Sequence, residues 1–207
     1  MTKEKFQTCL SEMPVVAILR GITPGEVVSV CSTLHSCGIR LLEIPLNSPD
    51  AFESIAIAAD YCRSNGMLAG AGTVLTQEDV RGVAASNGCF VISPNCNPAV
   101  IRETKACGML SVPGFFTATE AFQAMEAGAD YLKLFPAVLG PAYVKDLKAV
   151  VKAPIMAVGG VKAEDIPAFM KVCCGVGIGS AIYKAGKPLE QIRMDAAAIA
   201  KAAASRE

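Results

Sequence analysis

Short, nearly uninterrupted apolar segments recur along the chain, separated by longer segments of mixed apolar and polar residues. Within the short segments, apolar and small residues follow one another without the alternation expected of a strand that has one face in water. Such runs are typical of strands buried on both faces of a parallel sheet. The pattern predicts eight strands, over residues 15–20, 41–46, 67–74, 90–95, 110–115, 131–136, 155–161 and 175–180.

The intervening segments have helical periodicity and carry residue types that start and stop helices. Thr23 followed by Pro24 predicts a helix start, and Thr76 and Thr117 precede two further helical segments. Thr117 and Glu120 also have the spacing of a capping box. Glycines are expected to end the helices, and they recur about every 20 residues, at positions 38, 66, 88, 108 and 128.

Strands that alternate with helices predict a parallel α/β fold. Eight such units in 207 residues favour a compact (β/α)8 TIM barrel that forms a single domain over residues 1–207. The alternative is an open doubly wound sheet, which usually has a G-x-G-x-x-G turn after its first strand. The first predicted strand instead ends in RGIT, residues 20–23, which favours the barrel. Residues 3–12 are expected to form a short N-terminal helix at the bottom of the barrel.

Composition restricts the classes of protein and partner. Apolar residues make up 52% of the chain and charged residues 18%, which allows a large core and argues against disorder. Lys plus Arg and Asp plus Glu number 19 each, so the chain lacks the positive charge expected of a nucleic-acid-binding protein. A small phosphate site built from backbone amides is compatible with this balance.

The cysteines and the N-terminal residues favour a reducing, intracellular compartment. The nine cysteines are odd in number and include no Cys-x-x-Cys pair, which argues against a disulfide framework or a zinc ribbon and favours a reducing cytoplasm. Residues 1–13 have no apolar signal-peptide core, and no uncharged run resembles a transmembrane helix, so no membrane association is expected. His35 is the single histidine and is expected to be a partly exposed helix residue, which excludes a metal site with several imidazoles.

Polar residues at the ends of the predicted strands are candidate functional residues, because TIM barrels place their active sites at the carboxyl ends of the strands. Arg20, Glu43 and Lys133 supply the charged groups. Ser93 and Asn95 also fit ordinary turn roles. The further candidates are Asn47, Thr73, Gly159, Gly160, Gly179 and Ser180. The two glycine-containing turns match the usual phosphate site of such barrels, in which backbone N–H groups hold the anion.

Lys133 lies within an apolar strand, in the sequence YLKLFP. Burial would disfavour its charged form and lower its pKa, and Arg20 would lower that pKa further, whereas Glu43 would favour the ammonium. A neutral amine attacks carbonyl carbons and forms a Schiff base, for which a nearby carboxylate can transfer protons. The alternative is a structural ion pair between Glu43 and Lys133, although the cost of burial makes such pairs weak stabilisers.

Seven motifs in sequence order resemble one enzyme family: VVAILRGITP, LLEIPLNSP, AGAGTVL, ISPN, VPGFFTATEA, YLKLFP and VGGV. They resemble the 2-keto-3-deoxy-6-phosphogluconate and 2-keto-3-deoxy-6-phosphogalactonate aldolases, from about residue 14 to near the end of the chain. The resemblance implies a (β/α)8 barrel and a class I lyase that needs no metal and no cofactor. It also implies a homotrimer acting in carbohydrate metabolism.

The resemblance implies a role for each matching residue. Lys133 would form a Schiff base with the C2 keto group of the substrate, and Glu43 would be the general acid and base. The residues implied to contact the rest of the substrate are Arg20, Thr73, Pro94, Phe135 and Val158, and those implied to hold its phosphate are Gly159, Gly160, Gly179 and Ser180.

At two positions the residues of this chain resemble those of the galactonate-specific members. Asn47 stands where gluconate-type members typically carry an arginine, and Val158 stands where they carry a threonine before the Gly-Gly pair. The implied reaction is cleavage of 2-dehydro-3-deoxy-6-phosphogalactonate to pyruvate and D-glyceraldehyde 3-phosphate. Without the arginine, Arg20 is the candidate for the substrate carboxylate. The alternatives are the gluconate epimer or dual specificity, a phosphosugar isomerase or epimerase, which would not need Lys133, and a non-catalytic phosphosugar-binding protein.

Overall fold

The computed structural model describes residues 2–204 and alternates strands with helices along the chain. The strands are β1 (Val15–Ile18), β2 (Leu41–Pro45), β3 (Leu68–Gly72), β4 (Phe90–Ile92), β5 (Leu110–Val112), β6 (Gly114–Phe115), β7 (Leu132–Leu134), β8 (Ile155–Val158) and β9 (Gly175–Ile178). The helices are α1 (Thr2–Glu12), α2 (Val27–Ser36), α3 (Ala51–Ser64), α4 (Gln77–Ala85), α5 (Pro98–Ala106), α6 (Ala118–Glu126), α7 (Gly140–Leu147), α8 (Ile166–Met170) and α9 (Leu189–Ala204), with 3-10 turns η1 (Pro24–Glu26) and η2 (Ala163–Asp165).

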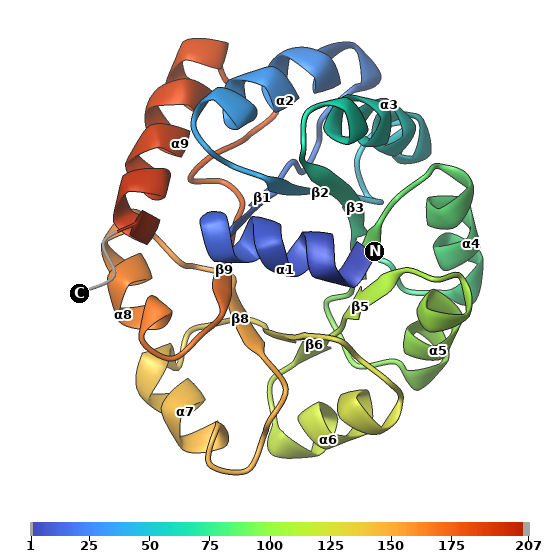
Figure 1. Cartoon of the computed structure of the whole chain (residues 1–207), viewed down its shortest axis with the longest axis vertical. Helices are drawn as coiled ribbons and strands as arrows, with labels where there is room; N and C mark the ends of the chain where they lie inside the picture. Colours follow the sequence, from blue (N-terminus) through green and yellow to red (C-terminus); the bar gives the residue numbers. More distant parts are fainter. Residues whose placement is uncertain (1, 205–207) are drawn as a thin grey trace.

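All strand pairs are parallel, and the strand order is β5-β4-β3-β2-β1-β9-β8-β7-β6. The two ends of this order, β5 and β6, are joined through Pro113 alone, so the sheet curves into a nearly closed barrel surrounded by helices (Figure 1). The predicted TIM barrel is therefore confirmed. No described helix is long and apolar enough to cross a bilayer.

The predicted fifth strand is divided in the structure. Residues 110–115 form β5 and β6, and Pro113 separates them. Proline has no backbone N–H to donate to a neighbouring strand, which explains the interruption. Its carbonyl still accepts a hydrogen bond from the N–H of Lys133, at 2.8 Å, so the segment remains bonded to β7.

The predicted helix boundaries are confirmed at most positions. The Thr117 hydroxyl accepts from the N–H of Glu120 at 3.4 Å, and the Glu120 carboxylate accepts from the N–H of Thr117 at 2.8 Å, which completes the capping box of α6. Gly88 is an exception, because α4 ends three residues earlier and the left-handed residue is Asn87, with φ of 59°. A Cβ at Gly88 would lie 2.5 Å from the side chain of Val83, so close packing requires this glycine.

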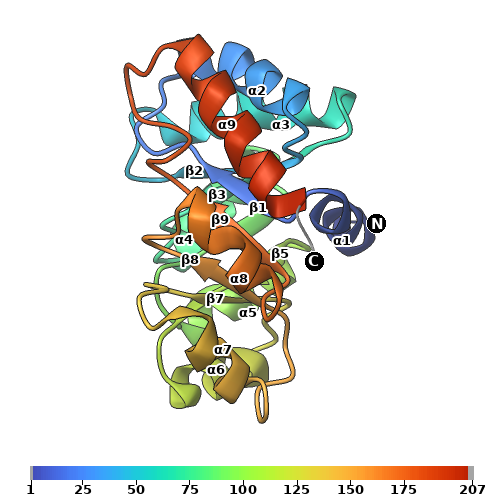
Figure 2. The same ribbon diagram turned by 90° about the vertical axis from the view of Figure 1, so that its left-hand side faces the viewer.

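Helix α1 covers the amino-terminal end of the barrel, as expected for residues 3–12. It crosses the centre of the ring in Figure 1 and lies on one side of the barrel in Figure 2. Phe6 is fully buried, and its ring lies 5.2 Å from the ring of Phe90 and 5.0 Å from that of Tyr131, measured between centroids. Burying such a side chain contributes about 1.5–3 kcal/mol. The bottom of the barrel is thus packed, and access to its interior is left to the carboxyl end.

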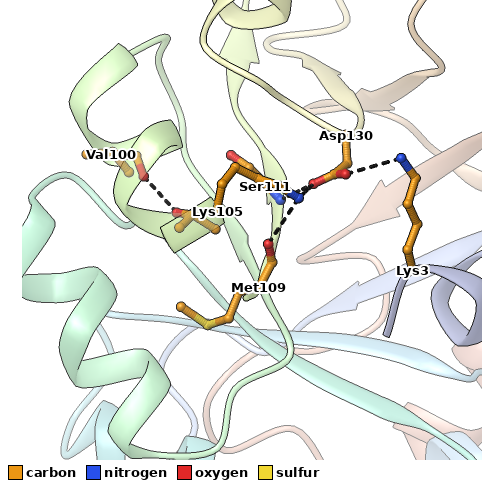
Figure 3. Close-up of polar contacts among 7 residues, drawn as sticks. Lys3, Val100, Lys105, Met109, Ser111 and Asp130 are labelled. Carbon is orange, nitrogen blue, oxygen red and sulfur yellow. Dashed lines mark hydrogen bonds and ion pairs between the residues drawn. The ribbon is translucent and has the colours of Figure 1, made fainter. Parts of the chain in front are cut away.

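Asp130 fixes the loop that precedes β7. Its side chain is only 6% exposed, and its carboxylate accepts a hydrogen bond from the N–H of Ser111 at 3.0 Å. The ammonium groups of Lys105, on α5, and Lys3, on α1, pair with the same carboxylate (Figure 3). One buried side chain therefore joins α1, α5 and β5 to the segment that leads into β7.

We expect Asp130→Ala to lower the free energy of unfolding by about 2–4 kcal/mol, because it leaves the Ser111 N–H and a partly buried ammonium without their acceptor. Urea denaturation followed by circular dichroism measures the change. The matched control is Asp60→Ala, since Asp60 pairs with Arg63 on the surface, where the side chains are 69% and 65% exposed. The control should change stability by no more than about 0.5 kcal/mol, and equal losses in the two variants would contradict the assigned role of Asp130.

Candidate active site

A cavity of about 560 Å³ opens at the carboxyl ends of β1, β2, β7, β8 and β9. It brings together residues that lie far apart in the sequence. The predicted site residues that line it are Arg20, Glu43, Lys133, Phe135, Val158, Gly159, Gly160, Gly179 and Ser180. The sheet order places β2 and β7 on opposite sides of the barrel, so Glu43 and Lys133 reach the cavity from opposite walls.

Glu43 is buried in the middle of β2, with 3% of its surface exposed. Its carboxylate lies directly over Gly72 of β3, where an added Cβ would be 2.1 Å from Oε2 of Glu43. Among the described residues, this oxygen has no hydrogen-bond partner. Burial raises the pKa of Glu43, and the nearby charges of Lys133 and Arg20 oppose that shift without cancelling it. The group therefore keeps its proton to a higher pH than an exposed glutamate does.

Lys133 lies in the centre of β7 and is 6% exposed. Burial lowers the pKa of its ammonium, Glu43 raises it, and Arg20 lowers it. No direct ion pair between Lys133 and Glu43 is present in the described part of the chain. The Nζ atom of Lys133 lies over the Phe135 ring, two residues further along, at 4.6 Å from the ring centre, so the aromatic face covers one side of the amine. The net shift favours the neutral amine relative to an exposed lysine.

Arg20 is held at the edge of the cavity by a polar contact between the ends of β1 and β2. Its Nη1 donates to Oδ1 of Asn47 at 2.6 Å, and both side chains are exposed. The N–H of Gly21 donates to the Ser48 hydroxyl at 2.9 Å, which joins the same two loops. The arrangement keeps a guanidinium at the cavity while Asn47 itself does not line it.

Four other predicted residues follow β3 and β4 and do not line the cavity. Thr73 has a left-handed backbone, with φ of 57°, which is costly for a branched residue and is found most often where function requires it. The buried Ser93 hydroxyl donates to the carbonyl of Val74 at 2.8 Å, which is a structural role. Pro94 is half-buried, and Asn95 is exposed.

The turns after β8 and β9 form the remaining wall. Gly159 and Gly160 both have positive φ, at 93° and 78°, and a Cβ on Gly159 would lie 3.0 Å from the Phe135 ring. Val158 is buried and lines the cavity next to them. The turn after β9 contributes Gly179 and Ser180.

Three polar side chains of the cavity were not predicted from the sequence: Lys162, Tyr183 and Lys184. All three lie beyond the strand ends, in loops where no periodicity marks a functional position. Their one signal is that they closely follow the two glycine-containing turns. The Tyr183 hydroxyl has no hydrogen-bond partner among residues 2–204, and burial raises its pKa to about 12.

This geometry suits covalent chemistry on a carbonyl compound. A shielded amine with a lowered pKa is a nucleophile, and a carboxyl group with a raised pKa can both donate and accept a proton near neutral pH. The two groups share one cavity, so both can reach a single bound molecule. In the described chain, no group of three or more His, Cys, Asp or Glu side chains is arranged to hold a metal ion.

Comparison with known proteins identifies the family. Residues 6–200 match the family model described as "KDPG and KHG aldolase". The 2-dehydro-3-deoxy-6-phosphogalactonate aldolase of Escherichia coli (strain K12) is 43% identical over 196 residues, which are 93% of this chain and 95% of that protein. The "Probable 2-dehydro-3-deoxy-6-phosphogalactonate aldolase" of Rhizobium meliloti (strain 1021) is 44% identical, over 90% of each chain.

A solved structure supports the same assignment. The structure called "Native KDPGal structure" superimposes with a TM-score of 0.89 and 42% sequence identity, over 92% of this chain and 94% of that chain. The resemblance seen in the sequence is thereby confirmed at the level of the family. Because the family model spans residues 6–200, the chain belongs to the KDPG and KHG aldolase family.

Proposed function

We propose that the chain is a class I aldolase that cleaves 2-dehydro-3-deoxy-6-phosphogalactonate to pyruvate and D-glyceraldehyde 3-phosphate. The observation that carries the proposal is the burial of Lys133 and Glu43 at opposite walls of one cavity, with burial favouring the neutral form of each. A neutral amine and a protonatable carboxyl group are the two functions that Schiff-base chemistry requires.

The choice of the galactonate substrate has two supports. The relatives from Escherichia coli and Rhizobium meliloti are both named for 2-dehydro-3-deoxy-6-phosphogalactonate. Asn47 and Val158 resemble the galactonate-specific members at two positions where gluconate-type members typically carry an arginine and a threonine. Val158 lines the cavity beside Gly159, and it therefore presents methyl groups where a threonine would present a hydroxyl. The absence of that hydroxyl changes the contacts available to the C4 hydroxyl of the substrate, which distinguishes the two sugars.

The first step joins Lys133 to the substrate. The lone pair of Nζ attacks the C2 carbonyl carbon, the C=O π bond breaks, and one proton passes from Nζ to the carbonyl oxygen to give a neutral carbinolamine. Loss of water, with a proton supplied by Glu43, leaves a cationic imine between Nζ and C2. The pKa of Glu43 is raised by burial, so the group holds the proton that this step needs.

The second step breaks the C3–C4 bond. Glu43, now a carboxylate, removes the proton of the C4 hydroxyl, and the C4 oxygen forms the aldehyde of glyceraldehyde 3-phosphate. The electron pair of the C3–C4 bond moves to the imine, which becomes a neutral enamine. Glu43 returns its proton to C3 of the enamine, which restores the cationic imine. One water molecule hydrolyses the imine to pyruvate and the neutral amine of Lys133, and the proton released returns to Glu43. No electron is gained or lost overall.

The remaining candidates would bind and orient the substrate. We assign Arg20 to the substrate carboxylate, since its guanidinium is exposed at the cavity and held there by Asn47. Phe135 would form a wall beside the imine, because its ring lies against Nζ of Lys133. For Thr73 and Pro94, which follow β3 and β4 and do not line the cavity, a substrate contact rests on the family resemblance alone.

The glycine-containing turns after β8 and β9 would hold the phosphate. Gly159, Gly160, Gly179 and Ser180 line the same end of the cavity, where backbone N–H groups can hydrogen-bond an anion. Such N–H groups supply neutral hydrogen bonds to the phosphate ester.

We also propose that the protein is a cytoplasmic homotrimer. All nine cysteines are free thiols, which supports a reducing compartment. Val138 and Leu139, in the loop between β7 and α7, are 69% and 49% exposed, and an adjacent apolar pair of this kind supports contact with another subunit near the cavity.

A coupled assay for pyruvate tests the reaction. The purified protein should release pyruvate from 2-dehydro-3-deoxy-6-phosphogalactonate faster than from its phosphogluconate epimer, and Lys133→Ala should release it from neither. In the presence of pyruvate, borohydride should add to the peptide containing Lys133 the mass of pyruvic acid less one oxygen atom, because it reduces the imine to an amine. Binding without turnover or adduct would contradict the proposed function.

We expect Gly72→Ala to act on proton transfer, because the new methyl group would occupy the position of the Glu43 carboxylate. Its kcat should fall at least about 100-fold, similar to the effect of Glu43→Gln, while borohydride still traps the pyruvate adduct at Lys133. The control is Gly25→Ala, since a Cβ at Gly25 meets no atom within 4 Å. Normal kcat in Gly72→Ala would contradict the proposed placement of Glu43.

The pH dependence of adduct formation reports the pKa of Lys133. Since attack on pyruvate needs the neutral amine, the trapping rate should rise with pH, with a midpoint below the ordinary lysine pKa of 10.5. The charge of Arg20 lowers this pKa, so Arg20→Gln should move the profile to higher pH. The surface variant Arg63→Gln should leave it in place. A profile that is centred at the ordinary value in the unmodified protein would contradict the lowered pKa.

A further inference from the structure

Two lysines at the cavity have no part in the reaction described above. Lys162 follows Val161 in the turn after β8, and Lys184 follows Tyr183 in the turn after β9. Both line the same cavity as Lys133, and both are exposed. They flank the two glycine-containing turns, one lysine on each.

The cavity between them also presents unused hydrogen-bond donors. Four of its lining residues donate no backbone N–H hydrogen bond to any residue of the described chain: Gly160, Val161, Ser180 and Ala181. Backbone donors that lie outside the strand ladders and face a cavity are available to a bound anion. These free N–H groups indicate an anionic ligand, and they do so independently of the two lysines beside them.

The ammonium group of Lys184 contributes no described contact that stabilises the fold. Its ammonium makes no hydrogen bond or ion pair with residues 2–204, whereas Lys187, three residues later, donates to the carbonyls of Ala181 and Ile182 at 3.2 and 2.8 Å and pairs with Asp195. Lys187 thereby fixes the loop that carries Lys184. Nζ of Lys162 approaches the exposed Glu164 only at 3.9 Å, a contact of little strength in water.

The charges around the cavity are unbalanced. Its titratable lining residues are Arg20, Lys133, Lys162, Lys184 and Glu43. With Lys133 as the neutral amine and Glu43 protonated, three cations remain and no carboxylate among the described lining residues opposes them. A substrate with a carboxylate at one end and a phosphate dianion at the other carries three negative charges, which match this excess. Arg20 and the amine of Lys133 serve the carboxylate and the carbonyl, so the two lysines are left for the phosphate.

We propose that Lys184, assisted by Lys162, binds the phosphate of the substrate and makes the enzyme selective for phosphorylated over unphosphorylated sugar acids. The inference rests on the proposed function and extends it. The glycine turns supply neutral donors, and the lysines supply the charge that distinguishes a phosphate ester from a free hydroxyl. The same charges would attract the substrate from solution. They act on binding and leave the steps at Lys133 unchanged.

The test compares the phosphorylated substrate with 2-dehydro-3-deoxygalactonate, which lacks the phosphate. In Lys184→Gln, kcat/KM for the phosphorylated substrate should fall about 10- to 100-fold, mainly through KM, because a charge-assisted hydrogen bond is lost. The value for the unphosphorylated compound should change by less than about 2-fold, and Lys184→Arg should restore most of the loss. Lys162→Gln should show the same pattern with a smaller loss, and high salt should narrow the difference between wild type and variants.

The matched control is Lys145→Gln, which removes the same charge from an exposed lysine of α7 outside the cavity. This variant should change kcat/KM for neither substrate. Equal losses of kcat/KM on both compounds, or no loss on the phosphorylated one, would overturn the inference.

Calorimetric titration with inorganic phosphate gives a readout that does not depend on turnover. Phosphate should bind the wild type and Lys145→Gln alike and should bind Lys184→Gln more weakly. If the wild type had no aldolase activity, the proposed function would fail, while this titration would still decide the role of Lys184. Equal phosphate affinity in all three proteins would reject that role even in an active aldolase.

Discussion

The proposed active site depends on one constraint: water is excluded from the amine of Lys133 and from the carboxyl group of Glu43 at the same time. Lys133 and Glu43 are almost fully buried on opposite walls of the barrel, and burial is the largest influence on the pKa of each. A close ion pair would stabilise both charged forms and would remove the nucleophile. No ion pair joins the two groups in the described part of the chain, and burial prevails over their attraction. In the proposed mechanism the same pair exchanges protons through a bound substrate.

Small residues in the sheet make room for this arrangement. Gly70 lies against the ring of Phe90 and Gly72 against the carboxylate of Glu43, and a Cβ at either position would come within 2.5 Å of those groups. Below them, α1 closes the other end of the barrel with Phe6. The barrel interior is therefore filled at its amino end by aromatic rings and remains open at its carboxyl end, where the chemistry is proposed to occur.

Most of the fold could be predicted from the sequence, because buried parallel strands and capped helices have strong local patterns. The departures have local causes: Pro113 divides a strand, and Asn87 takes the left-handed position expected near Gly88. Lysines in strands, such as Lys133, are conspicuous in an apolar run. Lys162 and Lys184 are not, because a loop lysine looks the same whether it faces water or a cavity. Only the packing of the loops places these two residues at the site.

The anchoring of Asp130 restricts how the length of the chain can change during evolution. Asp130 is fixed to Ser111 and Lys105, and Lys133 follows it by three residues, in the centre of β7. Successive strand residues point to opposite faces, so one residue inserted or deleted between the start of β7 and Lys133 would turn the amine toward the surrounding helices. Insertions before Asp130 would leave that register intact. Tolerance of insertions in this loop should therefore end abruptly by the start of β7.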